Sequence, residues 1–196
     1  MAVVEPLYAR AKQASPALER IRVLSLPFEI VFAAFAALGV VFYLVIIALG
    51  LFGGPHLRVS PESAWISANP PWPHDSIAVS DLPWASRIAG FAALTVIQGS
   101  LIGALFCLYK LFGRYRRGIV FAEAPMRWMR RAGVLLIIAA FAPLAFQPLV
   151  QAMGLRDRTW FHGQNVAELL VGAALFVIAS IIALGREIEN EGEGYV

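Results

Sequence analysis

The sequence contains a single cysteine, Cys107, and only three histidines. One cysteine excludes an intrachain disulfide framework, a CxxC redox pair and a cysteine metal cluster. The histidines lie outside the apolar runs, so they cannot form the facing pairs that hold haem inside a membrane. They also lack a metal-ligand spacing. We therefore expect neither a metal nor a cofactor.

Charged residues are also scarce. They make up 15% of the chain, while 59% of its 196 residues are hydrophobic. Soluble domains carry about 25% charged residues. A soluble core of this size could not hide so much apolar surface, whereas lipid removes the need for a polar exterior.

Four apolar runs are long enough to cross a bilayer, since about 30 Å of hydrocarbon requires about 20 helical residues. They cover residues 30–53, 88–109, 133–150 and 165–184, and Glu168 is their one charged residue. Lipid offers no hydrogen-bond partners, so these spans are predicted to be helical. The sequence thus predicts an all-α integral membrane protein with one domain of four transmembrane helices.

The distribution of lysine and arginine predicts the orientation. Segments 1–29, 110–132 and 185–196 together hold 12 of the 16 basic residues. The positive-inside rule places these segments in the cytoplasm, with both termini inside, as expected for a multi-pass protein of a bacterial inner membrane. Segment 54–87 is then a proline-rich extracytoplasmic loop. We expect it to form an ordered cap anchored by its tryptophans, or else a lid over a ligand pocket.

A few polar residues lie within or near the spans. Gln98 is near the middle of the second, Gln147 is in the outer part of the third, and Glu168 is one turn into the fourth. An ionisable group inside a span indicates function by default. Glu168 either has a structural role near the positive end of its own helix or binds a ligand or proton.

Small residues and prolines suggest how the spans pack. Gly99 and Gly103 form a GxxxG spacing, which favours close helix contact within the chain or with a second copy. Pro143 is predicted to kink the third helix. The kink belongs either to a bent structural helix or to a broken helix that lines a small cavity.

The segment between the second and third spans is the most basic. Gly118 is predicted to end the second helix, and Glu123 and Pro125 suit the first turn of the next helix. Met126 and Met129 then lie on one face of that helix, while Arg127, Arg130 and Arg131 point mostly toward water. The acidic tail faces the same compartment, so loop and tail either form a salt-bridged layer or stay solvated. The candidate partner-binding residues are Arg114, Arg116, Arg117, Arg127, Arg130, Arg131, Glu187, Glu189 and Glu191.

These stretches carry a family resemblance through Leu111, Phe112, Tyr115, Arg116, Arg117, Gly118, Phe121, Arg130, Arg131, Gly133, Glu187, Glu189, Asn190 and Glu191. They resemble domain-of-unknown-function family 2975, a bacterial family of small four-helix inner-membrane proteins. Ala122 departs from the family's small polar residue, and the outer loop does not match. The family has no assigned activity. Its members are often encoded beside small helix-turn-helix regulators, so the resemblance implies a regulatory link.

Two functions are consistent with these features. The first is a non-enzymatic regulatory or interaction protein whose cytoplasmic loop and tail engage a soluble partner, such as a helix-turn-helix regulator. The alternative is a small oligomeric transporter or channel component with a polar path near Gln98, Gln147 and Glu168. An enzyme is disfavoured because the sequence lacks a Ser-His-Asp set, a phosphate-binding glycine loop and HExxH. Direct nucleic-acid binding is not expected, since the positive-inside rule already accounts for the arginines.

The predicted orientation can be tested with reporter fusions. A fluorescent protein that matures only in the cytoplasm should be bright when fused after Val196, and alkaline phosphatase should be active when inserted after Asn69. The excess of basic residues on one side gives this expectation. An active phosphatase at Val196 would invert the assignment.

Overall fold

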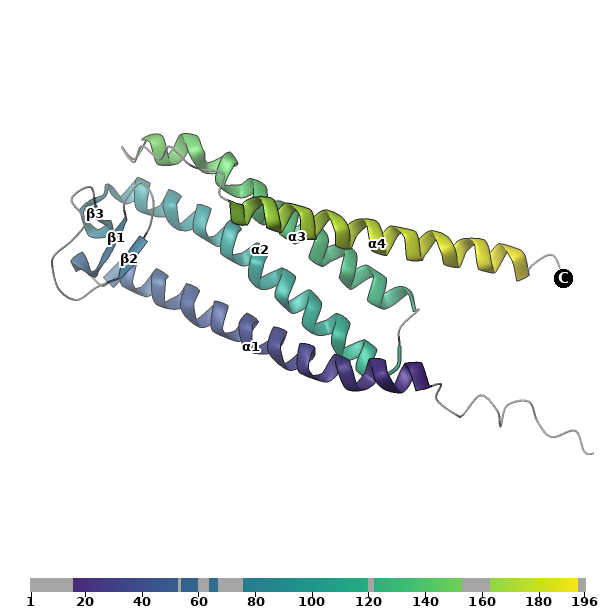
Figure 1. Cartoon of the computed structure of the whole chain (residues 1–196). Coiled ribbons are helices and arrows are strands. Elements are labelled where there is room, and N and C mark those ends of the chain that lie inside the picture. The colour runs from purple at the N-terminus through teal and green to yellow at the C-terminus, as the bar shows by residue number, and fades with distance from the viewer. Residues whose placement is uncertain are drawn as a thin grey trace, which may run out of the picture.

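The computed structural model describes residues 16–52, 54–59, 64–66, 76–119, 122–152 and 163–193. Four long helices dominate it: α1 (Pro16–Phe52), α2 (Trp84–Arg116), α3 (Glu123–Ala152) and α4 (Gly163–Glu193). Each contains a stretch long and apolar enough to cross a membrane, which confirms the prediction of four such helices. The N-terminal end of α1 and the C-terminal end of α4 lie at the same end of the bundle (Figure 1).

The helices are longer than the apolar runs that predicted them. α2, for example, has 33 residues and extends beyond the apolar run at both ends. At a rise of about 1.5 Å per residue it is about 50 Å long, which exceeds the hydrocarbon layer. A hydropathy pattern identifies only the apolar part of a helix, so the apolar runs did not include the polar ends of these helices.

A small sheet lies at one end of the bundle, which we call the sheet end. Strand β1 (Leu57–Val59) pairs antiparallel with both β2 (Ala64–Ile66) and β3 (Ile77–Ala78). The all-α prediction did not include these strands, because two or three residues are too few for a periodic signal.

Polar contacts hold this sheet together and attach it to α2. The Arg58 guanidinium donates to the hydroxyl and the carbonyl oxygen of Ser76, at 2.9 and 2.6 Å. Arg87, in the first turn of α2, donates to the carbonyl oxygens of Ser80 and Leu82. These hydrogen bonds link the described residues of segment 54–87 to one another and to the start of α2. Of its predicted tryptophan anchors, Trp72 and the side chain of Trp65 lie outside the described residues.

The four helices pack in sequence order rather than as a closed square. α1 packs on α2, α2 on α3, and α3 on α4, and these are the extensive helix contacts among the described residues. Figure 1 shows α1 and α4 on opposite sides of the α2–α3 pair. α1 is therefore the most exposed span, with 6% of its most apolar window buried.

A hydrogen bond adds to the α1–α2 contact. The Thr95 hydroxyl donates to the carbonyl oxygen of Phe91 at 2.6 Å, so it accepts the hydroxyl of Tyr43 at 2.7 Å. Interhelical hydrogen bonds of this kind stabilise helix pairs in lipid.

α3 and α4 come into backbone contact at Gly133 and Gly172. A Cβ added at Gly133 would lie 2.6 Å from the carbonyl oxygen of Gly172, and one added at Gly172 would lie 2.8 Å from that of Gly133. The two backbones therefore touch. Neither glycine belongs to a GxxxG spacing, so no sequence pattern indicated this contact.

The ribbon of α3 bends beyond this contact, in its light-green C-terminal part (Figure 1). Pro143 lies in that part of the helix and removes one backbone hydrogen bond, which is the physical cause expected for a bend. α3 nevertheless continues as a helix to Ala152.

The glycine contact gives a stability prediction. Gly172→Ala should destabilise the fold by about 1–3 kcal/mol, as expected for overpacking against backbone, although alanine favours a helix. The matched control is Gly90→Ala in α2, where an added Cβ meets nothing within 4 Å. Thermal unfolding in mild detergent measures both. An unfolding temperature for Gly172→Ala equal to that of the control would contradict the contact.

Candidate functional site

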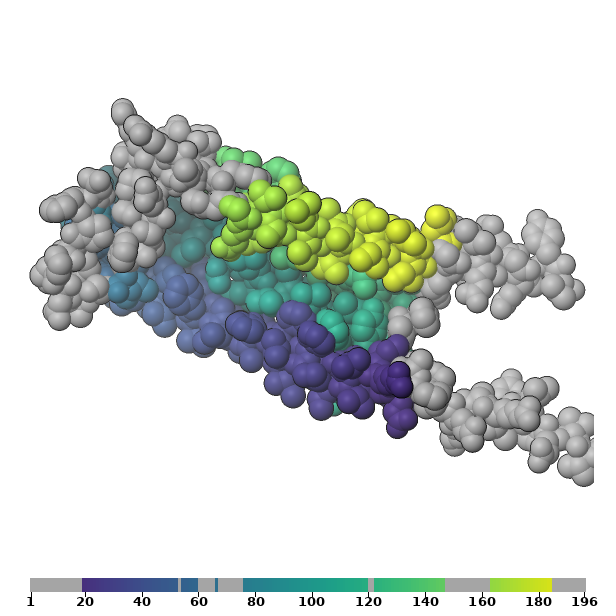
Figure 2. Space-filling model, in the orientation of Figure 1, coloured from purple at the N-terminus to yellow at the C-terminus, as the bar shows by residue number. Residues whose placement is uncertain are grey.

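Because α1 and α4 do not close the bundle, a groove of about 510 Å³ lies between them. We call it the lateral groove. All four helices contribute to it, and its polar lining residues are Gln98, Gln164 and Glu168. In Figure 2 it is the depression between α1 (purple and blue) and α4 (yellow-green), with the teal surface of α2 as its floor.

The lateral groove brings together two of the predicted polar residues. Gln98 on α2 and Glu168 on α4 line the same space, although they are 70 positions apart in the sequence. Gln164 joins them, and its side-chain amide donates to Oε1 of Glu168 at 2.9 Å. The third predicted residue, Gln147, has a side chain outside the described residues.

Glu168 lies deeper in the bundle than its position in the sequence suggested. α4 begins part-way along α2, as Figure 1 shows, rather than level with the start of α2 at the sheet end. Its first turns reach the level of Gln98, near the middle of α2. In a membrane, a carboxyl group at this depth would be largely removed from water, where an ionised side chain is unfavourable.

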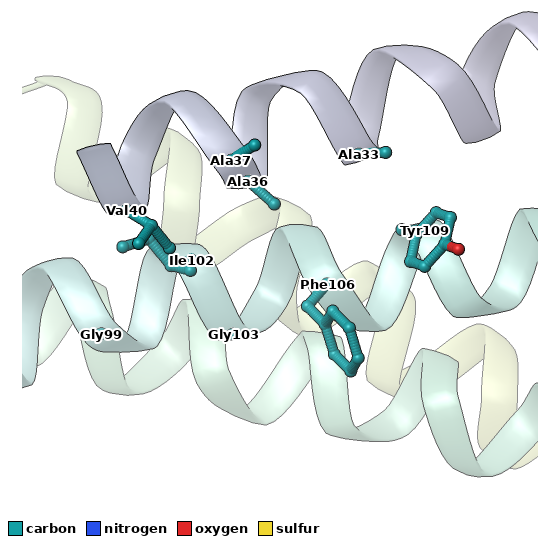
Figure 3. A pocket seen from close by; sticks show the side chains of 9 residues that line it. All are labelled: Ala33, Ala36, Ala37, Val40, Gly99, Ile102, Gly103, Phe106 and Tyr109. Carbon is teal, nitrogen blue, oxygen red and sulfur yellow. The ribbon is translucent and has the colours of Figure 1, made fainter. Parts of the chain in front are cut away.

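The GxxxG glycines lie on a different face of the bundle. Gly99 and Gly103 line a groove of about 480 Å³ between α1 and α2, together with Ala33, Ala36 and Ala37 (Figure 3). A Cβ at Gly99 would meet nothing within 4 Å, whereas one at Gly103 would lie 3.1 Å from Cδ1 of Leu135 on α3. Gly103 thus contacts a neighbouring helix, and a packing role for Gly99 stays a prediction.

The opposite end of the bundle, which we call the basic end, carries the turn between α2 and α3. Gly118 follows the end of α2 and has a φ of 78°, a conformation that favours glycine. The amide of Gly118 donates to the carbonyl of Tyr115, and that of Ile119 donates to the carbonyl of Arg114. This pair of bonds is a Schellman motif. It confirms that Gly118 ends the helix.

The start of α3 also follows the sequence pattern. The helix begins at Glu123, so Pro125 lies in its first turn, where a missing backbone N–H is tolerated. Met126 and Met129 are buried, while Arg127 and Arg130 are exposed. Helical periodicity alone predicted this division of faces.

An ion pair that sequence analysis missed fixes the turn to α1. Nε of Arg116 lies 2.7 Å from Oε2 of Glu29, and Nη2 donates to Oε1 over a long 3.5 Å. The shorter contact lies off the N–H direction, so Oε2 accepts no hydrogen bond from the described residues. The Glu29 side chain is 13% exposed, and its carboxylate lies against Gly113, where a side chain would displace it.

Glu29 could have been noticed in the sequence. It is the last charged residue before the first apolar run, but nothing in the sequence indicated a partner 87 positions away.

A second α1 residue approaches the same turn. The guanidinium of Arg22 lies over Gly118, where Nη2 would be 2.6 Å from an added Cβ. Phe28 and Phe32 of α1 also stack with Phe112 of α2, with centroids 5.1 and 5.4 Å apart. α1 therefore packs against one side of the turn between α2 and α3 (residues 117–122), which we call the basic turn.

The remaining predicted arginines differ in their surroundings. Arg131 lies over the ring of Trp128 at 5.2 Å, while Arg117, Arg127 and Arg130 are exposed. Arg114 is half-buried. The predicted acidic residues Glu187, Glu189 and Glu191 lie on the helical backbone of α4, but their side chains are outside the described residues.

α4 extends beyond the helix that supports it. Gly172 lies opposite Gly133, and α3 begins only ten residues before Gly133. The two helices are antiparallel and rise equally per residue, so α4 passes the start of α3 near Ile182. Figure 1 shows this yellow end of α4 projecting past the basic end of the bundle.

Within the described residues, no three His, Cys, Asp or Glu side chains lie close enough together to hold a metal ion. Comparison with protein-family models, curated proteins and solved structures gives no match for this chain. The family resemblance of the basic turn and the tail therefore stays a prediction.

Proposed function

We propose that this chain is a non-enzymatic interaction protein of a bacterial inner membrane, with both termini in the cytoplasm. Its basic turn and the projecting end of α4 would engage a soluble partner, such as a helix-turn-helix regulator. The observation that carries this proposal is the extension of α4 to Glu193, beyond the start of α3. A projecting helix end rich in glutamate is a ready binding element for a basic partner surface.

Contacts in the described part of the basic turn support the proposal. The Schellman motif shapes the end of α2, and the Glu29–Arg116 pair and the approach of Arg22 join this end to α1. Binding to a preorganised surface loses less conformational entropy than binding to a mobile loop. Arg117 and Arg127 are exposed on this framework, so they are the residues that a partner would contact first.

Charge reversal tests this proposal. Full-length protein in mild detergent should retain a soluble partner from the cytoplasm, and Arg117→Glu and Arg127→Glu should each weaken retention about tenfold, or about 1.4 kcal/mol. Retained proteins are identified and quantified by mass spectrometry. The matched control is Arg20→Glu, the same charge change on an exposed residue of α1.

Retention of the partner by both reversed variants at the wild-type level would contradict the proposed contact. Equal loss in the Arg20→Glu control would show that net charge, and not this surface, governs binding.

The lateral groove favours a second candidate, a small oligomeric transporter or channel component. Gln98, Gln164 and Glu168 form a polar cluster in an otherwise apolar wall. Polar groups at mid-membrane depth are typical of ion and proton pathways. Four helices are few for a complete path, so a path through this groove would need further copies of the chain.

Proton flux tests the second candidate. In proteoliposomes containing a pH-sensitive dye, a Glu168-dependent path should lose most of its flux in Glu168→Gln, because an amide cannot exchange a proton, and should be reduced in Gln98→Leu. Glu123→Gln is the control, since Glu123 is exposed in the first turn of α3. Flux unchanged by the Glu168 and Gln98 variants, or equal to that of protein-free vesicles, would exclude the path.

A further inference from the structure

A third groove runs between α2 and α3 at the basic end and differs chemically from the other two. It has a volume of about 470 Å³. Gly103 and Cys107 of α2 and Val134 and Leu135 of α3 form its apolar part. Arg130 and Arg131 line its other part, with the rings of Phe106 and Trp128 beside them. We call it the α2–α3 groove.

Aromatic contacts gather the positive charges at its mouth. The Phe106 and Trp128 rings meet edge to face, with centroids 6.3 Å apart. Nζ of Lys110 lies 5.1 Å from the centroid of Phe106, and the guanidinium of Arg131 lies 5.2 Å from that of Trp128. Each of these two adjoining rings therefore attracts one cation.

These cations lack a counter-charge among the described side chains. The one ion pair there joins Arg116 to Glu29, on the side of α2 that faces α1. No described carboxylate lies within ion-pair distance of Lys110, Arg130 or Arg131. The groove therefore has three positive charges at one end and an apolar lining along the rest. An anionic group would be stabilised at the charged end only.

We propose that the α2–α3 groove binds an anionic phospholipid from the leaflet at the basic end. Its phosphate lies among Lys110, Arg130 and Arg131, and an acyl chain lies along Gly103, Cys107 and Val134. Basic pockets between membrane helices bind anionic headgroups in this way.

The groove between α1 and α2 provides an internal comparison. It has nearly the same volume, about 480 Å³, but it is lined by alanine, glycine, valine, isoleucine, phenylalanine and tyrosine, without a charged residue. It could accommodate any acyl chain, but it has nothing that would select a headgroup. Of these two grooves, we therefore expect only the α2–α3 groove to select lipids by the charge of their headgroup.

This inference does not depend on the proposed function. It assigns Arg130 and Arg131 to lipid and leaves Arg117 and Arg127 for a soluble partner. Substitutions at Arg130 and Arg131 test lipid binding, and substitutions at Arg117 and Arg127 test partner binding. Either proposal can therefore be rejected without rejecting the other.

Lipid titration followed by native mass spectrometry tests the site. Full-length protein in mild detergent is titrated with dioleoyl phosphatidylglycerol and, separately, with dioleoyl phosphatidylcholine, which carries the same chains without net charge. The double variant Arg130→Gln/Arg131→Gln should weaken retention of phosphatidylglycerol about 30-fold, which corresponds to about 1 kcal/mol for each basic residue. The matched control, Arg117→Gln/Arg127→Gln, removes the same charge outside the groove and should leave retention unchanged.

A second variant tests the apolar part without changing charge. Val134 lines the groove and is 41% exposed, so Val134→Trp should fill the groove without disturbing the core and should weaken phosphatidylglycerol retention. Millimolar inorganic phosphate should not displace the lipid, because the chain contributes to binding. Monodisperse elution of each variant in size-exclusion chromatography shows that it is folded.

Three results would overturn the proposal. Equal retention of the two lipids would show that the groove does not bind the headgroup. Equal loss of lipid in both double variants would show that general surface charge accounts for the binding. Complete displacement by phosphate would indicate a site for a soluble anion. If the double variant Arg130→Gln/Arg131→Gln does not fold, the Val134→Trp variant provides the test. Retention of phosphatidylglycerol at the wild-type level in Val134→Trp would reject the groove as the binding site.

Discussion

The hydrocarbon core of a membrane can neither donate nor accept hydrogen bonds, and the helical architecture of this molecule depends on that constraint. It makes each of the four apolar segments helical, because the backbone must satisfy its own polar groups. It also removes the hydrophobic drive that would bring helices together in water, so van der Waals contact must replace it. Alanine is accordingly the most frequent buried residue of the helices, and the backbones of α3 and α4 meet at two glycines, Gly133 and Gly172.

The order of packing decides where function can lie. A closed bundle would have buried its polar residues in one core. Here α1 contacts α2 extensively but lies apart from α4, and the row of helices leaves open grooves on its faces. One groove holds a polar cluster in an apolar wall, one is apolar throughout and one has positive charges at one end. The three grooves would bind different ligands, because different sets of helices line them and the lining side chains differ in polarity and charge.

Charge has two roles at the basic end. The bias of arginine and lysine toward one end is what membrane insertion requires, and it needs no ligand to explain it. The local arrangement is more specific, since Glu29 neutralises Arg116 while aromatic rings position Lys110 and Arg131. Residues that look equivalent in a run of basic sequence thus differ in what they can bind.

The sequence alone determined the four helices, the turn at Gly118 and the division of faces at Met126 and Met129, because hydropathy, glycine conformation and helical periodicity are local properties. It also identified Gln98 and Glu168 as unusual. Only the tertiary structure showed that these two line one groove, that Glu29 pairs with Arg116 and that Gly133 meets Gly172. Such contacts depend on how far one helix is shifted along another. That shift arises from the fit of whole helix surfaces, which no single segment of the sequence encodes.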